Sequence, residues 1–319
     1  MDSKTDPRAA SGFSREFIAR RLHSLAGIAF LLFLCEHMFT NSQATLLLGD
    51  DGKGFVRMVN WIHSLPYLVV IELTFIALPL VVHTWWGIER LKLAKINSIP
   101  SDGRAVSLPY SRNIAFTWQL ITSVLLIVAI GLHVYYMRFA KEPESEPYGI
   151  LTQYFVKVSV DPGLYTLAPR LNLMLFDAAL LDEAIPHLQG SDNSLPDLAS
   201  QVKQNEQLAF EKRTIEAMKA LQPTQNEVVV LCDNFGTAVL LMLRDTFKSV
   251  WMCILYSLFV IMASFHGANG LWTFAITWGI TLSERSRVLI RTATTFLMAL
   301  LIFFGLACVW GVYWINLRF

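Results

Sequence analysis

Five stretches of the chain are apolar over enough residues to cross a lipid bilayer as helices. They cover about residues 20–41, 66–88, 114–137, 249–280 and 289–316. A helix needs roughly 20 mainly apolar residues to span about 30 Å of hydrocarbon. Aromatic residues typical of membrane–water interfaces lie near the ends of these stretches: Trp61, Tyr67, Trp85, Trp86, Trp118, Trp251, Trp310 and Trp314. The pattern predicts an all-α membrane protein with a bundle of five transmembrane helices.

A long polar connection separates the third apolar stretch from the fourth. It covers residues 141–248, is rich in acidic residues and is interrupted by proline and glycine. Helix-like patterns near 171–184 and 200–221 predict an ordered helical insertion. The chain then divides into an N-terminal segment (1–19), helices one to three (20–140), the insertion (141–248) and helices four and five (249–319).

Lysine and arginine residues indicate how the helices are oriented. Most of those outside the insertion lie in the N-terminal segment, the 89–112 loop and the 282–291 turn. The opposite short segments carry only Lys53, Arg57, Arg138 and Arg318. Positively charged short loops stay in the cytoplasm. We therefore expect a cytoplasmic N-terminus, an external insertion and a retained first helix, in a multi-pass protein of the bacterial cytoplasmic membrane.

Composition excludes several classes of function. Only 16% of residues are charged, against about 25% in a soluble domain, and the net charge of +1 does not suggest nucleic-acid binding. The four cysteines form no CxxC pair, so neither a zinc ribbon nor a disulfide framework is indicated. No CxxCH motif is present, which argues against a covalently attached haem.

Four apolar stretches each contain a histidine in the interior: His37, His83, His133 and His266. Ionisable residues inside a membrane are costly and usually functional. Neutral imidazole is a common axial ligand of haem iron. Four such residues on four helices predict two b-type haems, each held by two histidines.

Depth along each helix sorts these histidines, at about 1.5 Å per residue. His37 follows Arg20 by 17 residues and His133 follows Ile114 by 19, so both approach the external side. His83 lies towards the cytoplasmic end of the second helix, whereas counting leaves His266 ambiguous. Pairing His37 with His133 leaves His83 with His266. Nearby glycines would let a macrocycle approach the backbone: Gly87, Gly131, Gly267 and Gly270.

Two other interpretations of the histidines remain open. A single histidine inside a membrane is often a hydrogen-bonding group between helices. His23 and His37 also have the 14-residue spacing of cytochromes that place two ligands on one helix, but no second helix carries such a pair. His23 is expected at the cytoplasmic helix start, where with Arg20, Arg21 and Ser24 it is a candidate contact for haem propionates. Arg138 is the corresponding candidate at the external side.

Several motifs resemble a known family, the di-haem cytochrome b anchor subunits of succinate:quinone oxidoreductases. They are RRLHSL at 20–25 with Glu36 and His37, SLP at 64–66 with Glu72, LPL at 78–80 with His83, GLHV at 131–134, FHGANGLW at 265–272 and AITWGIT at 275–281. The last two are the most specific. The resemblance covers about residues 15–140 and 249–316 and is closest to single-subunit anchors with five helices.

The resemblance implies His37 and His133 on an external-side haem, and His83 and His266 on a cytoplasmic-side haem. It implies two partner subunits at the cytoplasmic face, a flavoprotein with FAD and an iron–sulfur protein. The chain would then exchange electrons with a membrane quinone, and the family favours menaquinone. The insertion departs from the family, in which this connection is usually short.

Quinone chemistry couples electrons to protons and needs a titratable group close to a haem. His63 at the external end of the second helix is one candidate, and Glu36 and Glu72 are acids well inside the span. Ordinary interfacial or inter-helix hydrogen bonding would also explain these three residues. The competing functions are a cytochrome b anchor of hydrogenase or formate dehydrogenase, and a haem-free transporter whose histidines relay protons.

Overall fold

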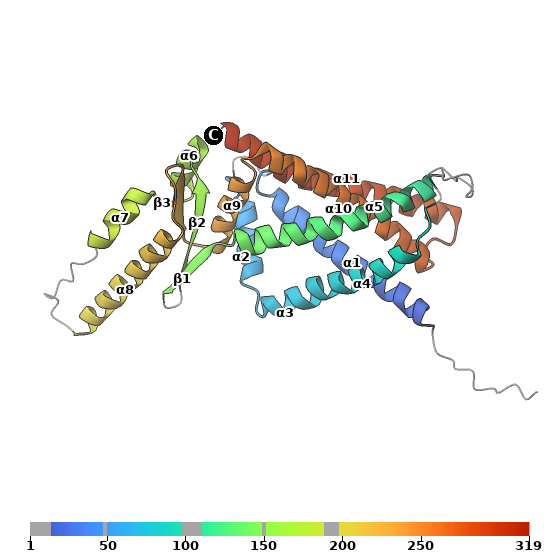
Figure 1. The fold of residues 1–319 in the computed structure, drawn as a ribbon, viewed down its shortest axis with the longest axis horizontal. Helices are drawn as coiled ribbons and strands as arrows, with labels where there is room; N and C mark the ends of the chain where they lie inside the picture. The colour runs from blue at the N-terminus through green and yellow to red at the C-terminus, as the bar shows by residue number, and fades with distance from the viewer. Residues whose placement is uncertain are drawn as a thin grey trace, which may run out of the picture. The chain divides into compact units, whose positions relative to one another are not determined.

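The computed structural model describes residues 14–46, 50–96, 98, 110–148, 151–187 and 198–318 (Figure 1). Most of the N-terminal segment lies outside this range, with Lys4 and Arg8, as does Arg104 of the basic loop. The side chain of His187 is also outside the described part.

The described residues contain five helical spans long and apolar enough to cross a membrane, as predicted. They are α1 (Arg15–Ser42), the second span (Leu68–Leu93), the third span (Ser111–Ala140), α10 (Val250–Thr277) and α11 (Glu284–Arg318). The third span consists of α5 (Ser111–Val134) and the π-helical η2 (Tyr135–Ala140). The protein is thus a mainly helical, multi-pass membrane protein.

The second span is irregular in the turn that precedes Pro79. It runs as α3 (Leu68–Glu72), the π-helical η1 (Leu73–Ala77) and α4 (Leu78–Leu93). Proline has no N–H and its ring crowds the carbonyl four residues earlier. In the turn before it, the Leu78 amide bonds to the Leu73 carbonyl, five residues back. The π-helical turn thus lies immediately before the proline, which occupies the start of α4.

The chain divides into two compact units, which both include parts of the spans. The first comprises the described residues up to Cys35, Val69–Ile127 and Ala263–Met298. The second comprises Glu36–Leu68, Val128–Met262 and Ala299–Phe319. The insertion belongs to the second unit, as does the short helix α2 (Lys53–His63).

The insertion contains a four-stranded antiparallel sheet, so the prediction of a helical insertion is wrong in this respect. The strand order is β1 (Glu144–Tyr148), β2 (Leu151–Ser159), β4 (Glu227–Cys232) and β3 (Met174–Phe176). Strand β3 occupies part of the expected helix 171–184, which begins only at α7 (Ala178–His187). The expected helix near 200–221 is confirmed as α8 (Leu198–Ala220).

Helices cover both faces of the sheet (Figure 1). On one face Val156, Val228 and Val230 pack with α6 (Pro162–Arg170) and α9 (Phe235–Thr246). On the other face Phe155 and Val229 pack with Leu181 of α7 and Met218 of α8. A strand buried on both faces is a continuous apolar run, here VVVLC, which periodicity alone does not distinguish from a helix.

Helix α9 joins the insertion to the ends of the spans in the second unit. Its residues Ala238 and Leu241 face the sheet. Its other side contributes Leu240, Leu243 and the following Phe247 to a second core. That core also contains residues of α2, α10 and α11: Phe55, Cys253, Cys308, Val309 and Val312. The insertion is therefore packed against the spans of its own unit.

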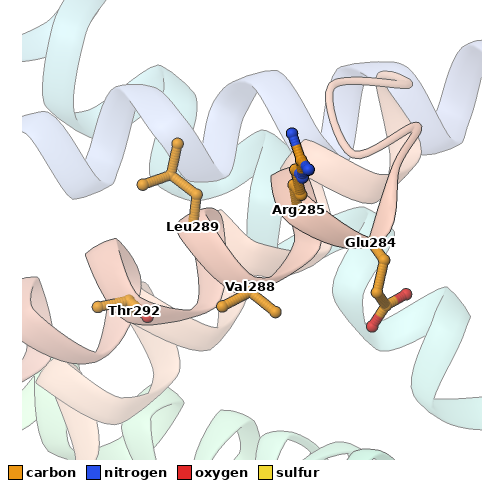
Figure 2. Close-up of a pocket in the computed structure, with 5 residues that line it drawn as sticks. All are labelled: Glu284, Arg285, Val288, Leu289 and Thr292. Carbon is orange, nitrogen blue, oxygen red and sulfur yellow. The ribbon is translucent and has the colours of Figure 1, made fainter.

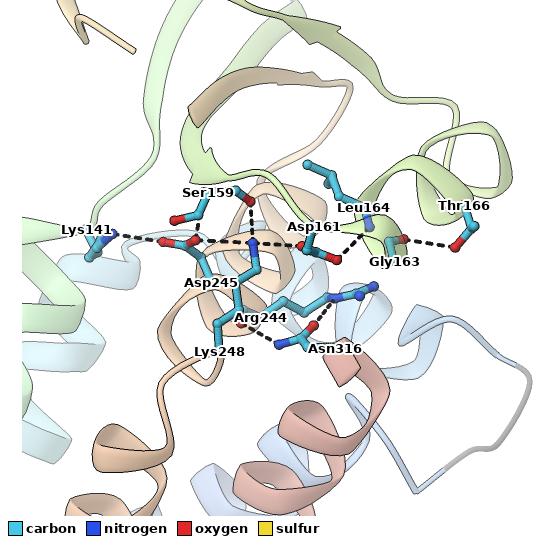
Figure 3. A network of polar contacts seen from close by, with 10 residues as sticks. All are labelled: Lys141, Ser159, Asp161, Gly163, Leu164, Thr166, Arg244, Asp245, Lys248 and Asn316. Atoms are coloured by element: carbon cyan, nitrogen blue, oxygen red, sulfur yellow. Dashed lines mark hydrogen bonds and ion pairs between the residues drawn. The ribbon is translucent and has the colours of Figure 1, made fainter. Parts of the chain in front are cut away.

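A network of ion pairs and hydrogen bonds connects α9 to neighbouring segments of the insertion (Figure 3). Asp245 of α9 bonds to Lys141 at 3.1 Å and accepts the Ser159 amide at 2.9 Å. Lys248 contacts Asp245 and pairs with Asp161 at 2.8 Å. Burial alone would raise the pKa of Asp245, but the Ser159 amide and the two lysines hold it below its usual value. The folded state therefore favours the ionised carboxylate.

Replacing Asp245 with asparagine should lower the free energy of unfolding of the insertion by about 2 kcal/mol at neutral pH, since charge-assisted hydrogen bonds are lost. The lowered pKa stabilises the fold above the ordinary aspartate pKa of about 4, and this contribution disappears as the pH falls through the folded-state pKa. Hydrogen exchange of the β4 amides in the full chain checks the effect. It is measured at neutral pH and again at a pH below the ordinary aspartate pKa of about 4.

A control for Asp245→Asn is Glu216→Gln, which removes an exposed ion pair of 3.9 Å with Lys212. Exposed pairs contribute little, so β4 exchange should not change. If Asp245→Asn destabilises the insertion equally at neutral and acidic pH, the stabilisation does not come from the charge of the Asp245 carboxylate.

Candidate haem-binding sites

The structure brings the four span histidines together as two pairs. In the second unit, His37 of α1 and His133 of α5 have ring centroids 5.8 Å apart and ring planes at 81°. In the first unit, His83 of α4 and His266 of α10 are 6.1 Å apart at 84°. These are the same pairs that depth along the helices predicts. We refer to them as the outer pair and the inner pair.

The spacing within each pair fits two imidazoles on opposite sides of one iron. A metal–nitrogen bond to histidine is about 2 Å long, and the nitrogen lies about 1 Å from the ring centre. Two axial imidazoles therefore have centroids roughly 6 Å apart. Both pairs match this value, on different pairs of helices.

In the outer pair, polar groups contact the Nδ1 atoms. The Tyr256 hydroxyl lies 3.1 Å from Nδ1 of His133. The Asn41 amide lies 3.5 Å from Nδ1 of His37 and donates to the His37 carbonyl at 2.7 Å. Metal-ligating histidines typically donate their second ring N–H to such a partner, which fixes the ring orientation. In His133 this contact occupies Nδ1, so Nε2 would be the atom that binds a metal.

The inner pair has the same organisation. Nδ1 of His83 lies 3.0 Å from the His23 carbonyl, and Nδ1 of His266 lies 3.3 Å from the Thr122 hydroxyl. Gln119 donates to the His266 carbonyl at 3.2 Å and accepts from Asn269 at 2.8 Å. Asn41, Thr122, Gln119 and Tyr256 were not identified from the sequence. Asn41 follows His37 by one helical turn, which is a usable signal, whereas the others meet a histidine only across helices.

Gly27 allows His83 to approach α1 closely. A Cβ atom at this position would lie 2.9 Å from Cε1 and Nδ1 of His83. No side chain fits there without moving the ring, because real Cβ contacts are longer. The absence of a side chain thus permits the bond from His83 to the His23 carbonyl.

His23, which is expected at the cytoplasmic helix start, contacts His83 of the inner pair. Its ring stacks on that of His83, with centroids 4.1 Å apart and planes at 12°. Its Nδ1 lies 3.0 Å from the His83 carbonyl, so the two residues contact each other's backbone reciprocally. His23 therefore contacts His83 of the inner pair through both its ring and its backbone.

The nearby glycines divide into two groups. A Cβ at Gly267 would meet Leu31 at 2.9 Å, and one at Gly87 would meet His23 at 3.5 Å, so both face a neighbouring protein side chain. Nothing lies within 4 Å of a Cβ at Gly131 or Gly270. These last two positions retain space next to His133 and His266.

The four candidate propionate contacts other than His23 have protein partners. Arg20 pairs with Glu16, which also contacts Arg90 at 3.2 Å. Arg138 pairs with Glu142 at 3.1 Å. The Arg21 guanidinium lies 4.5 Å from the Trp278 ring, and Trp278 donates to the Ser24 hydroxyl at 3.2 Å. Their contact with propionates stays a prediction.

The candidate quinone residue His63 is surrounded by insertion residues that sequence analysis did not identify. Its ring stacks on Phe235 at 4.1 Å and 18°, and its Nε2 lies 3.4 Å from the Tyr154 hydroxyl. Glu36, in the same unit, accepts from Thr40 at 2.6 Å. Glu72 belongs to the first unit, so the three candidates do not form one cluster within a unit.

A shallow surface hollow lies at the start of α11 (Figure 2). It is lined by Glu284, Arg285, Val288, Leu289 and Thr292, none of which is a candidate site residue. It does not contribute to either histidine pair.

Comparison with known proteins agrees with the resemblance found in the sequence. The chain is 22% identical over 299 residues to the succinate dehydrogenase cytochrome b558 subunit of Bacillus subtilis (strain 168). The aligned residues cover 93% of this chain and 98% of that protein. No family model matches the chain. The match runs over nearly the whole of both proteins, and it supports the resemblance to cytochrome b membrane anchors of succinate dehydrogenase.

Proposed function

We propose that this protein is the membrane-anchor cytochrome b subunit of a succinate dehydrogenase and that it passes electrons through two b haems to a membrane quinone. The observation that carries the proposal is the pair of histidine couples, each with the ring spacing of two axial ligands on one iron. The similarity to the Bacillus subtilis subunit supports the same assignment.

In this proposal His37 and His133 hold the outer haem, and His83 and His266 hold the inner haem. The haems supply one-electron transfer when bound. The chain's residues keep each imidazole oriented through Nδ1, with Tyr256 at the outer site and the His23 carbonyl at the inner site. Such contacts set ligand basicity and ring orientation.

The proposed partners are a flavoprotein with FAD and an iron–sulfur protein at the cytoplasmic face. The excess of lysine and arginine in the short segments on the N-terminal side supports this orientation. His83 and His266 would hold the haem nearer these partners, and His37 and His133 the haem nearer the quinone, for which menaquinone is the favoured species.

Copurification tests the proposal against the alternatives. A tagged chain should bring down a flavoprotein and an iron–sulfur protein, contain two b haems per chain and be reduced by succinate. Reduction by hydrogen or formate instead would assign the chain to another membrane dehydrogenase. A colourless protein would indicate a haem-free transporter and would contradict both.

His63 is the residue that we place at the quinone. Its stacking on Phe235 holds an imidazole at the end of α2, next to the Tyr154 hydroxyl. An imidazole can donate a proton to a quinone while the quinone is being reduced. Glu36 and Glu72 are the candidates for supplying protons further inside the span.

Replacing His63 with leucine should slow succinate-driven quinone reduction by about 100-fold, because positioned acid–base groups contribute at least that much. Both haems should still bind and be reduced by succinate. Stopped-flow spectra separate the two steps. Trp61→Phe, at a neighbouring exposed position of α2, is the control and should leave the rate close to that of the unmodified chain. Unchanged quinone reduction in His63→Leu would exclude this role.

A further inference from the structure

Tyr256 brings a phenol hydroxyl to the outer histidine pair. Tyr256 belongs to α10 and His133 to α5, and the Tyr256 hydroxyl lies 3.1 Å from Nδ1 of His133. The corresponding atom of His83 has a backbone carbonyl, and that of His266 has a threonine hydroxyl. A phenol is therefore the polar partner of one ligand in the outer pair.

The tyrosine ring is held by a residue at the end of the insertion. Phe247 follows α9 directly, is 2% exposed and packs edge-on against Tyr256 with centroids 5.1 Å apart at 87°. The Phe247 carbonyl also accepts from the Cys253 thiol at 3.7 Å. The position of the phenol thus depends on packing with the insertion.

We propose that Tyr256 is a positioning residue for the outer haem and that, through Phe247, the insertion sets the redox potential of that haem. This inference rests on the proposed role of His133 as an iron ligand. With Nε2 on the iron, Nδ1 carries a hydrogen and donates it to the Tyr256 oxygen. The bond makes the imidazole a stronger electron donor, which stabilises oxidised iron and lowers the reduction potential.

The test is a redox titration of the full chain purified with its haems. Tyr256→Phe keeps the ring and removes the hydroxyl. Both haems should remain, and the midpoint potential of the outer haem should move to more positive values while that of the inner haem stays. The outer haem is identified as the one that His133→Ala removes.

Two further variants complete the design. Thr122→Val removes the hydroxyl beside His266 and should shift only the inner haem, which shows that the titration resolves the two sites. Phe247→Leu keeps the phenol but loosens its packing, and should shift the outer haem in the same direction as Tyr256→Phe, by less. This variant remains informative if Tyr256→Phe binds haem poorly.

The outcomes separate the inference from the proposed function. Two haems with an unchanged outer potential in Tyr256→Phe would overturn the role of Tyr256 and leave the proposed function intact. A shift in Tyr256→Phe with none in Phe247→Leu would overturn the link to the insertion. An unmodified chain without haem would instead overturn the proposed function itself.

Discussion

Replacing His133 with alanine is expected to leave one b haem per chain and to abolish succinate-driven quinone reduction. In the proposed arrangement this change removes one axial ligand of the outer haem and leaves His83 and His266 in the other unit unchanged. The remaining haem should still be reduced by succinate. Haem-to-protein stoichiometry, difference spectra and quinone turnover measure the three parts of this result.

Asn41→Ala is the matched control for His133→Ala. Its amide contacts His37 Nδ1 at 3.5 Å and donates to the His37 carbonyl at 2.7 Å, but Asn41 is not a proposed ligand, so both haems should be retained. Loss of both haems in His133→Ala would contradict two separate pairs. Retention of both would contradict His133 as a ligand.

Replacing Gly27 with alanine is expected to displace the inner haem, although glycine to alanine is favourable in most helices. The new Cβ would lie 2.9 Å from the His83 ring and would push it off the His23 carbonyl. Overpacking of this kind costs about 1–3 kcal/mol. Each 1.4 kcal/mol is a factor of ten in binding, so affinity for the inner haem should fall by about 5-fold to 100-fold. Haem stoichiometry and the rate at which succinate reduces the outer haem report the loss.

Gly87→Ala is the control for Gly27→Ala, in the same unit and four residues after His83. Its Cβ would meet His23 at 3.5 Å, an ordinary contact. It should keep both haems. If Gly27→Ala binds two haems and passes electrons at the normal rate, the close approach of His83 to α1 has no functional role.

The spans and the histidine pairs could be predicted because they depend only on positions along the chain. No knowledge of which helices pack together is needed. Apolar runs of bilayer length identify helices without knowledge of their neighbours. A fixed rise per residue places His37 and His133 at similar depth. Only the depth of His266 stayed ambiguous, since it lies near the middle of its segment.

The contacts of the histidines could not be predicted because they depend on which helix faces meet. Tyr256 lies 123 residues from His133 in the chain, and no motif around Tyr256 in the sequence indicates that the two residues meet. The sequence predicts His23 at the cytoplasmic helix start, but it gives no sign that the His23 ring stacks on His83. Strand β4 was missed because a short apolar run is ambiguous until its neighbours are known.

The core around α9 constrains how the protein can mature. Leu240 and Leu243 of α9 pack with Val309 and Val312, which lie near the end of the last helix. During synthesis the core on this side of α9 is therefore incomplete until Val309 and Val312 of α11 have been made. A chain truncated before Val309 would retain four complete spans, α11 up to Cys308 and the whole sheet. We expect it to be recognised by quality-control proteases, because the apolar side of α9 would lose the part of its cover that Val309 and Val312 provide.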